Sequence, residues 1–565
     1  MNMTLPVNFR AILIVIATLL LALTLPNPAK MQDFFVHGSY AIMAVLFFVW
    51  LGILLKHAIA SKADPKAFLR SYGPGILFAV ALSIFIFVSV KPSLRVLADE
   101  TNVLAVSKSM VYERAVDNVT EAKWYFLNFQ PISRVLEKRS LLFPFFASII
   151  HILTGYRLEN VFVLNFFALA ALLSLLHIWF KKHLGAAWSY IMLFLVVSQP
   201  IVSLCAASGG LELLQVLFLL IAFMSLERFM EDASAANFEL LWINLIMLCH
   251  TRYESFIFFI VCMALLGYFK YIRLEFFTKS ALYALTPILC LPILWQRILM
   301  RGHFQEPPGV PVFAVEHYIK YNVMFLKNLF NFQFFLPYAN VVNLVGLAGL
   351  LYFVQKIFER NPQKSKTRAH FLLFVLVLMC CSWIIFTSHF LGTMELPSSG
   401  RFYLMFCIAL SLAAGLMLYQ LRGILPTRIT AVAALAAFCV YHPIAVENRF
   451  INSQVIIREY RFVDDFLKKL NDPNLLLVYG APGFFTVRNY GSVHYSHANA
   501  NKEQILNEYK RRLFSDIYVV QEISYDSGKP TDETALVSDY ELEPLTGLQN
   551  TAETYLRMSK VVNKR

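Results

Sequence analysis

Long apolar stretches, each about 14 to 22 residues and separated by short polar turns, dominate this sequence. A helix of about 20 apolar residues crosses the hydrocarbon core of a bilayer. No soluble core could hide this much apolar surface, because 58% of the residues are hydrophobic and only 15% are charged. We therefore predict a polytopic α-helical membrane protein with about thirteen transmembrane helices. The expected spans are 11–27, 36–56, 73–90, 160–180, 185–203, 209–229, 237–250, 253–269, 279–298, 340–356, 369–390, 402–420 and 429–445.

Lysine and arginine concentrate in every second short loop, which gives the helices an expected orientation. These loops lie around residues 56–70, 181–182, 270–273, 356–368 and 422–428. The positive-inside rule places them in the cytoplasm, together with the N-terminus. The net charge of +13 then follows from membrane topology, so we expect no nucleic-acid partner.

The opposite, extracytoplasmic side receives the loop 91–140 and the chain after about residue 446. In this tail a helical pattern at 455–470 precedes two strand-like apolar runs, at 475–479 and 517–520. A polar helix is expected between the two runs, and this order predicts a small α/β domain. The expected parts are N-terminal helices 1–90, a first outer loop with interfacial helices 91–155, a transmembrane core 156–446 and the α/β domain 447–565.

Asp99 and Glu100 directly follow the third expected span, at the outer membrane surface. A carboxylate in this place could serve as the general base of a catalytic site. An amphipathic helix is also expected at about 101–111, so Asp99 could instead cap that helix by accepting the N–H of Asn102. Taken alone, the motif favours the cap, and the charged residues that accompany it favour the base.

Basic residues stand at three further outer ends of apolar segments. They are Lys138 and Arg139 after Glu137, Arg252 in the run His250-Thr251-Arg252-Tyr253-Glu254, and Arg401 before Phe402 and Tyr403. Charges at this depth are costly and usually face a cavity or pair with each other. With an acidic pair nearby, they suit binding of an anionic lipid head beside a general base. The simpler alternatives are a lipid-headgroup anchor at 138–139 and pairing of Arg252 with Glu254 or Glu212.

The order of these features resembles the GT-C superfamily of membrane glycosyltransferases. That superfamily includes the lipid A aminoarabinose transferases, the protein O-mannosyltransferases and the dolichyl-phosphate-mannose-dependent mannosyltransferases. The matching motifs are Asp99-Glu100-Thr101, Glu137-Lys138 before a short apolar helix ending at Leu153-Thr154-Gly155, the run 248–254, and Arg401-Phe402-Tyr403. This chain departs from the pattern in three places. Three expected spans precede the acidic loop instead of one, Asn102 replaces a basic residue, and Phe402 replaces the usual tyrosine.

The resemblance implies transfer of a sugar from a polyprenyl-phosphate donor to a lipid, glycan or protein acceptor, with inversion at the anomeric carbon. Asp99 and Glu100 would be the catalytic residues, with Asp99 as general base. The donor phosphate would be bound by Lys138, Arg139, Arg252 and Arg401. The donor or acceptor pocket would include Glu137, Tyr253, Glu254 and Tyr403.

Cofactor and location also follow from the resemblance. In some relatives a carboxylate matching Glu137 joins a histidine around a metal ion, and His303 and His317 are the histidines of the outer loops. No cofactor is required by the mechanism, and a divalent metal stays open. The chain would lie in a bacterial inner membrane, in contact with membrane lipids, with its C-terminal domain in the periplasm.

Three other functions compete with this one. A glycan polymerase or ligase would normally carry a large outer loop late in the chain, whereas the longest loop here comes early. A transporter or flippase of lipid-linked sugars predicts internal repeats and mid-span charges, and neither is clear in this sequence. A membrane-anchored interaction protein leaves the charged turns unexplained. The transferase therefore remains the leading hypothesis.

Overall fold

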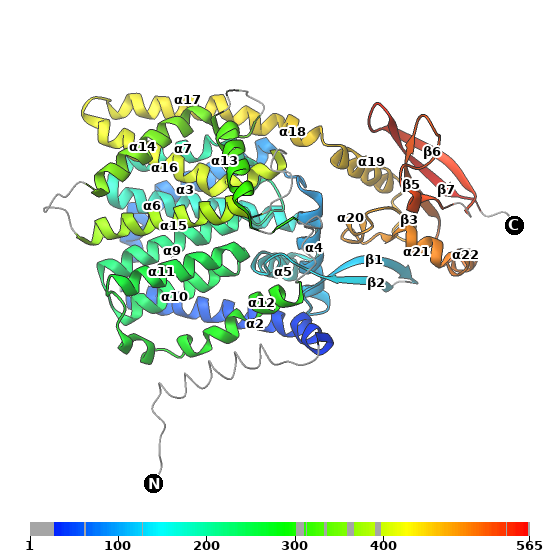
Figure 1. Cartoon of the computed structure of the whole chain (residues 1–565), viewed down its shortest axis with the longest axis horizontal. Coiled ribbons are helices and arrows are strands. Elements are labelled where there is room, and N and C mark those ends of the chain that lie inside the picture. The colour runs from blue at the N-terminus through cyan, green and yellow to red at the C-terminus, as the bar shows by residue number, and fades with distance from the viewer. Residues whose placement is uncertain are drawn as a thin grey trace, which may run out of the picture. The chain divides into compact units, whose positions relative to one another are not determined.

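The computed structural model divides the chain into two compact units (Figure 1). The helical unit takes the described residues up to Ser93, together with Lys138–Phe146 and Val161–Asn448. The sheet unit takes Leu94–Glu137, Ala147–Asn160 and the described residues from Arg449 onward. The structure describes residues 28–61, 64–126, 128–300, 310–311, 313–330, 332, 336–358, 366–389, 397–537 and 540–562.

The helical unit is a bundle of apolar helices. Eight described helices are long and apolar enough to cross a membrane, and the bent pair α7 and α8 could form a ninth span. The chain is thus an integral, multi-pass membrane protein. The expected number of thirteen spans stays a prediction, and the expected span 11–27 lies outside the described residues. The helices are α2 (Pro28–Ala60), α3 (Pro65–Val90), α6 (Asn160–Leu184), α7 (Ala186–Val197), α8 (Pro200–Ala206), α9 (Glu212–Glu231), α10 (Ala235–Cys249), α11 (Phe256–Tyr268), α12 (Leu282–Leu299), α13 (Val315–Phe330), α14 (Asn340–Phe358), α15 (Lys366–Ser388), α16 (Leu404–Gln420) and α17 (Thr427–Glu447).

A buried glutamine stabilises the sharp bend between α7 and α8. The two helices meet at 78°, and Pro200 begins α8, where its missing N–H costs no helical bond. Gln199 donates to Asn343 Oδ1 at 2.8 Å and Ser411 Oγ at 3.0 Å, and it accepts the N–H of Ala339 at 3.0 Å. A helix break among apolar helices needs such partners, because no water is present there to satisfy polar groups.

Helices α14 and α16 approach closely because two glycines of α14 face the backbone of α16. A Cβ atom at Gly346 would overlap the carbonyl oxygen of Leu410, and one at Gly349 would overlap that of Ala413. Small residues of this kind let apolar helices pack backbone to backbone in a membrane.

We expect Gly346→Val to lower the free energy of unfolding of the helical unit by about 1–3 kcal/mol. The added side chain has no space, so α16 must move. The measurement is the thermal unfolding of the detergent-purified protein, followed together with its monodisperse fraction. Gly267→Val in α11 is the matched control, since nothing lies within 4 Å of a Cβ there. Equal losses in both variants would contradict the packing argument.

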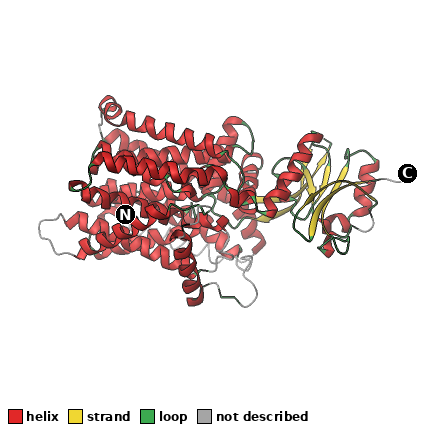
Figure 2. Cartoon of the chain, turned by 90° about the horizontal axis from the view of Figure 1, so that it is seen from above, coloured by secondary structure: helices red, strands yellow, loops and turns green. Residues whose placement is uncertain are grey.

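The sheet unit contains one seven-stranded mixed sheet, drawn in yellow in Figure 2, with strand order β2-β1-β4-β3-β5-β7-β6. Strand β3 runs parallel to both β4 and β5, and the other pairs are antiparallel. Both edge strands contain a proline, Pro131 in β2 and Pro544 in β6, which discourages pairing with other chains. The elements are α4 (Leu97–Tyr112), β1 (Asp117–Tyr125), β2 (Asn128–Leu136), α18 (Arg449–Asn452), α19 (Val455–Leu470), β3 (Leu476–Val478), α20 (Gly483–Thr486), β4 (Gly491–Val493), α21 (Tyr495–Ala500), α22 (Lys502–Lys510), β5 (Ile517–Ser524), β6 (Leu542–Gln549) and β7 (Thr554–Val561).

The predicted tail helix at 455–470 and the two predicted strand runs are confirmed as α19, β3 and β5. A small sheet domain near the C-terminus is thereby confirmed as well. The sequence did not predict β1 and β2, which lie in the first outer loop yet belong to the same sheet as the tail. Loop and tail thus form one structural unit, although the sequence separates them by the whole transmembrane core.

The short apolar helix α5 (Leu142–Thr154) has only 13 residues. It is too short to be counted among the candidate spans, in agreement with its expected interfacial character.

Candidate functional site

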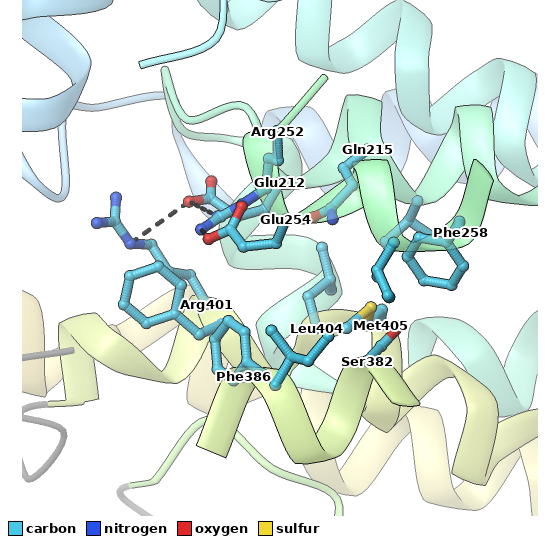
Figure 3. Close-up of a pocket in the computed structure, with 14 residues that line it drawn as sticks. Glu212, Gln215, Arg252, Glu254, Phe258, Ser382, Phe386, Arg401, Leu404 and Met405 are labelled. Atoms are coloured by element: carbon cyan, nitrogen blue, oxygen red, sulfur yellow. Dashed lines mark hydrogen bonds and ion pairs between the residues drawn. The ribbon is translucent and has the colours of Figure 1, made fainter. Parts of the chain in front are cut away.

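Three turns at the N-terminal ends of helices bring charged side chains together in the helical unit (Figure 3). Glu212 is the first residue of α9, Arg252 precedes the short 3₁₀ turn Tyr253–Ser255 that leads into α11, and Arg401 lies in the 3₁₀ turn Pro397–Tyr403 before α16. These segments are far apart in the sequence, so only the fold makes them neighbours.

Two hydrogen bonds from α6 fix the turn before α9, which leads to Glu212. Asn165 on α6 donates from Nδ2 to the carbonyl oxygens of Ser208 at 2.7 Å and Gly210 at 2.8 Å. A Cβ atom at Gly210 would lie against Oε2 of Glu212, so this carboxylate oxygen packs directly on the glycine.

The turn that carries Arg252 is held from both sides. The His250 imidazole donates from Nε2 to the carbonyl oxygen of Leu289 at 2.8 Å, and the Leu142 N–H donates to the carbonyl of His250 at 3.3 Å. His250 therefore has a structural role in orienting the next residues.

An ion-pair network joins the three turns. Arg252 binds Glu254 through Nη2 at 2.9 Å and Nε at 3.2 Å. Oε1 of Glu212 lies 3.5 Å from Arg252 Nη1 and 3.4 Å from Arg401 Nε. Both guanidinium groups also lie near the ring of Phe402, at 5.1 Å and 4.9 Å from its centroid. The alternative pairing of Arg252 with Glu254 and Glu212 is thus confirmed, and it places Arg401 in the same cluster.

The cluster lines one end of a small pocket between α9, α11, α15 and α16. Gln215 and Ser382 add two neutral polar groups, and the rest of the wall is apolar (Figure 3). The apolar lining comprises Val216, Ile257, Phe258, Ile385, Phe386, Phe402, Leu404 and Met405. A pocket with a charged end and an apolar wall suits a molecule with an ionic head and a hydrocarbon chain.

Helix dipoles favour negative charge at the charged end of this pocket. The N-terminal ends of α9, α11 and α16 all contribute lining residues there. Helix N-termini and guanidinium groups both stabilise anions. Among the described lining residues, the anionic groups at this end are the carboxylates of Glu212 and Glu254.

The other basic and aromatic residues predicted for the site are placed differently. The Tyr253 ring lies 3.8 Å from the Arg297 guanidinium, and Tyr403 is buried with its ring centroid 4.3 Å from that of Phe325. Lys138 and Arg139 belong to the helical unit, where the Arg139 carbonyl accepts the side chain of Gln296 at 2.7 Å. None of these four predicted residues lines the described pocket.

Asp99, Glu100 and Glu137 belong to the sheet unit. Helix α4 begins at Leu97 with Val96 as N-cap, so the interpretation of Asp99 as an N-cap for a helix at 101–111 is wrong. The reason is that Glu100, from the first turn, accepts the N–H groups of Arg95 and Val96 and starts the helix earlier. Glu100 is 1% exposed, whereas Asp99 is half-buried.

A lysine anchors helix α4 within the sheet unit. Lys108 donates to the carbonyl of Thr486 at 2.9 Å, and its Nζ lies 3.9 Å from the centroid of the Phe129 ring. Burial lowers the pKa of this ammonium to about 7. The helix that begins at the acidic motif is thus tied to both β2 and α20.

Sequence reasoning did not select Glu212, Gln215, Ser382 or Phe402 as site residues. Glu212 opens an apolar segment two residues after Gly210, and an acid at such a helix start was the available signal. The two neutral polar residues stand within apolar helices and carry no local signal.

Two histidines of the outer loops were considered as possible metal ligands. His303 lies outside the described residues, and Nε2 of His317 donates to the carbonyl of Pro311 at 2.9 Å. Within the described part of the chain, no group of three or more histidine, cysteine, aspartate or glutamate side chains is arranged to hold a metal ion.

Comparison with solved structures identifies the fold. The apo structure of ArnT from Cupriavidus metallidurans matches with a TM-score of 0.50 and 11% sequence identity, covering 86% of this chain and 98% of that one. ArnT of the same organism bound to undecaprenyl phosphate gives a TM-score of 0.48, also at 11% identity, covering 86% and 97%. No family model and no curated protein sequence matches this chain. The chain has a GT-C fold, as the order of its motifs predicted.

Proposed function

We propose that this protein is a GT-C glycosyltransferase that transfers a sugar from a polyprenyl-phosphate donor to an acceptor outside the cytoplasm. The observation that carries this proposal is the convergence of Arg252 and Arg401 on one oxygen at the charged end of an apolar-walled pocket. In a GT-C fold, these two guanidinium groups suit the phosphate of the donor lipid, and the apolar residues beside them suit its hydrocarbon chain.

In the proposed reaction, Asp99 takes the proton of an acceptor hydroxyl while the acceptor oxygen bonds to the anomeric carbon from the side opposite the phosphate. The bond between the anomeric carbon and the phosphate oxygen breaks, and its electron pair stays on the phosphate. Arg252 and Arg401, assisted by Lys138 and Arg139, stabilise that growing charge. Inversion follows from a single displacement.

The remaining predicted residues have supporting roles in this proposal. Glu100 is a positioning residue, because its carboxylate starts the helix that carries Asp99. Glu254 orients Arg252 through two short contacts. Glu137, Tyr253 and Tyr403 are proposed to shape the surroundings of donor and acceptor, and a divalent metal is not needed for the step as written.

Arg401→Ala tests the phosphate site. We expect the Kd for undecaprenyl phosphate to rise at least about tenfold, because one of two guanidinium groups that address the phosphate is lost. Arg401 is the better probe of the two arginines, since Glu212 keeps its contact with Arg252 in this variant. The measurement is a binding titration of the detergent-purified protein.

Arg422→Ala is the matched control, because Arg422 lies on the Tyr419 ring at the opposite end of the same helix region. It should leave the Kd unchanged. Equal affinities of the wild-type protein and Arg401→Ala would remove Arg401 from the donor site, and absence of binding to the wild type would argue against the proposed function.

A further inference from the structure

A single oxygen atom of Glu212 occupies the point that both arginines address. Its Oε1 lies 3.5 Å from Arg252 Nη1 and 3.4 Å from Arg401 Nε. These distances exceed the usual 2.7–3.2 Å of a good N–H···O bond, whereas Arg252 holds Glu254 at 2.9 Å. The two arginines therefore hold Glu212 loosely, so a phosphate oxygen that binds both guanidinium groups lies beside this carboxylate.

The carboxylate itself has little room to withdraw. Glu212 is 5% exposed, and its other oxygen lies against Gly210, whose turn is fixed by two hydrogen bonds from Asn165. Any anion bound by the two arginines thus stays close to a fixed negative charge. The apolar wall of the pocket keeps the local dielectric low and strengthens this interaction.

Among the described residues that line the pocket, two guanidinium groups face two carboxylates. The lipid ligands of the proposed reaction differ in charge. A polyprenyl-phosphate sugar is a phosphodiester with one negative charge, whereas the released polyprenyl phosphate is a monoester with about −1.5 to −2 charges at pH 7. Repulsion from a fixed carboxylate rises in proportion to the charge of the ligand.

We propose that Glu212 is a specificity-determining residue that favours the singly charged donor over the doubly charged lipid product. This inference rests on the proposed function. When the bond to the anomeric carbon breaks, the lipid phosphate gains one negative charge next to Glu212. Repulsion between the two then weakens binding of the lipid phosphate by the arginines. The same residue that crowds the phosphate site thereby promotes release of the spent lipid.

Two lipid probes test this selectivity directly. They are undecaprenyl phosphate and its methyl phosphodiester, titrated at pH 8 against the detergent-purified full-length protein. The wild type should bind the phosphodiester more tightly than the monoester. Glu212→Gln should tighten binding of the monoester at least about tenfold and change that of the phosphodiester several-fold less. Glu212→Asp keeps the charge and should keep the preference of the wild type.

Glu231→Gln is the charge-matched control, because Glu231 ends the same helix at about 28 Å from Glu212 and is half exposed. It should change neither Kd.

Three outcomes would overturn the inference. The first is a wild type that binds the monoester more tightly than the phosphodiester, which needs no variant. The second is a Glu212→Gln protein in which both affinities change equally. The third is weaker binding of both lipids by Glu212→Gln, which would make Glu212 an orienting partner of the arginines. A wild type that binds neither lipid would instead refute the proposed function, so the two failures are distinguishable.

Discussion

Asp99→Asn is expected to lower the rate of sugar transfer by about 10²–10⁴-fold, because asparagine cannot accept the proton of the acceptor hydroxyl. Helix capping cannot explain such a loss. The N-cap of α4 is Val96, and the carboxylate that accepts the backbone N–H groups at this end belongs to Glu100. The change should therefore leave the thermal unfolding of the protein close to that of the wild type.

The measurement is turnover with a polyprenyl-phosphate sugar, with lipid binding followed in parallel. Glu100→Gln provides the comparison, since it should lower stability by weakening the start of α4 and lower activity only as a consequence. An Asp99→Asn protein with full activity would remove the general-base role. Loss of folding in Asp99→Asn would show that Asp99 has a structural role that the capping geometry does not reveal.

The sequence predicted the helices well and part of the sheet poorly, for a physical reason. Apolar runs of span length have few alternatives to a membrane helix, and the amphipathic pattern of α19 is strong over its full length. Strands β1 and β2 lack clear alternation, and Pro131 within β2 argues against a strand. The strand β4, which pairs with β1, is far away in the chain, as the Trp124–Asn489 hydrogen bond across 365 positions shows. Pairing at this distance has no local signal.

The candidate site shows the same division between local and long-range information. Arg252 and Arg401 could be predicted as site candidates, because charges at the ends of apolar segments are costly and usually face a cavity or pair with each other. Their meeting at Glu212 was not predictable, because an acid in the first turn of a helix already has an ordinary explanation in the helix dipole. Tyr403 looked equivalent to Arg401 in the sequence, yet the 3₁₀ turn points it into an aromatic cluster with Phe325.

Arg252→Ala is expected to destabilise the helical unit by about 3–5 kcal/mol and to abolish lipid binding. Arg252 pairs with both glutamates of the network, so its loss removes the ion-pair partner of the largely buried Glu254 carboxylate and one of two partners of Glu212. An uncompensated buried charge carries this cost. Thermal unfolding in detergent and titration with undecaprenyl phosphate measure the two effects.

A double variant separates stability from binding. Replacing a buried ion pair by apolar residues of similar size is often neutral, so Arg252→Leu combined with Glu254→Leu should recover most of the lost stability. Glu212 keeps its contact with Arg401 in that protein. Lipid binding should stay lost, because the guanidinium group that addresses the phosphate is absent. If the double variant is stable and binds undecaprenyl phosphate like the wild type, Arg252 serves only to neutralise its glutamates, and the donor phosphate must bind elsewhere in the fold.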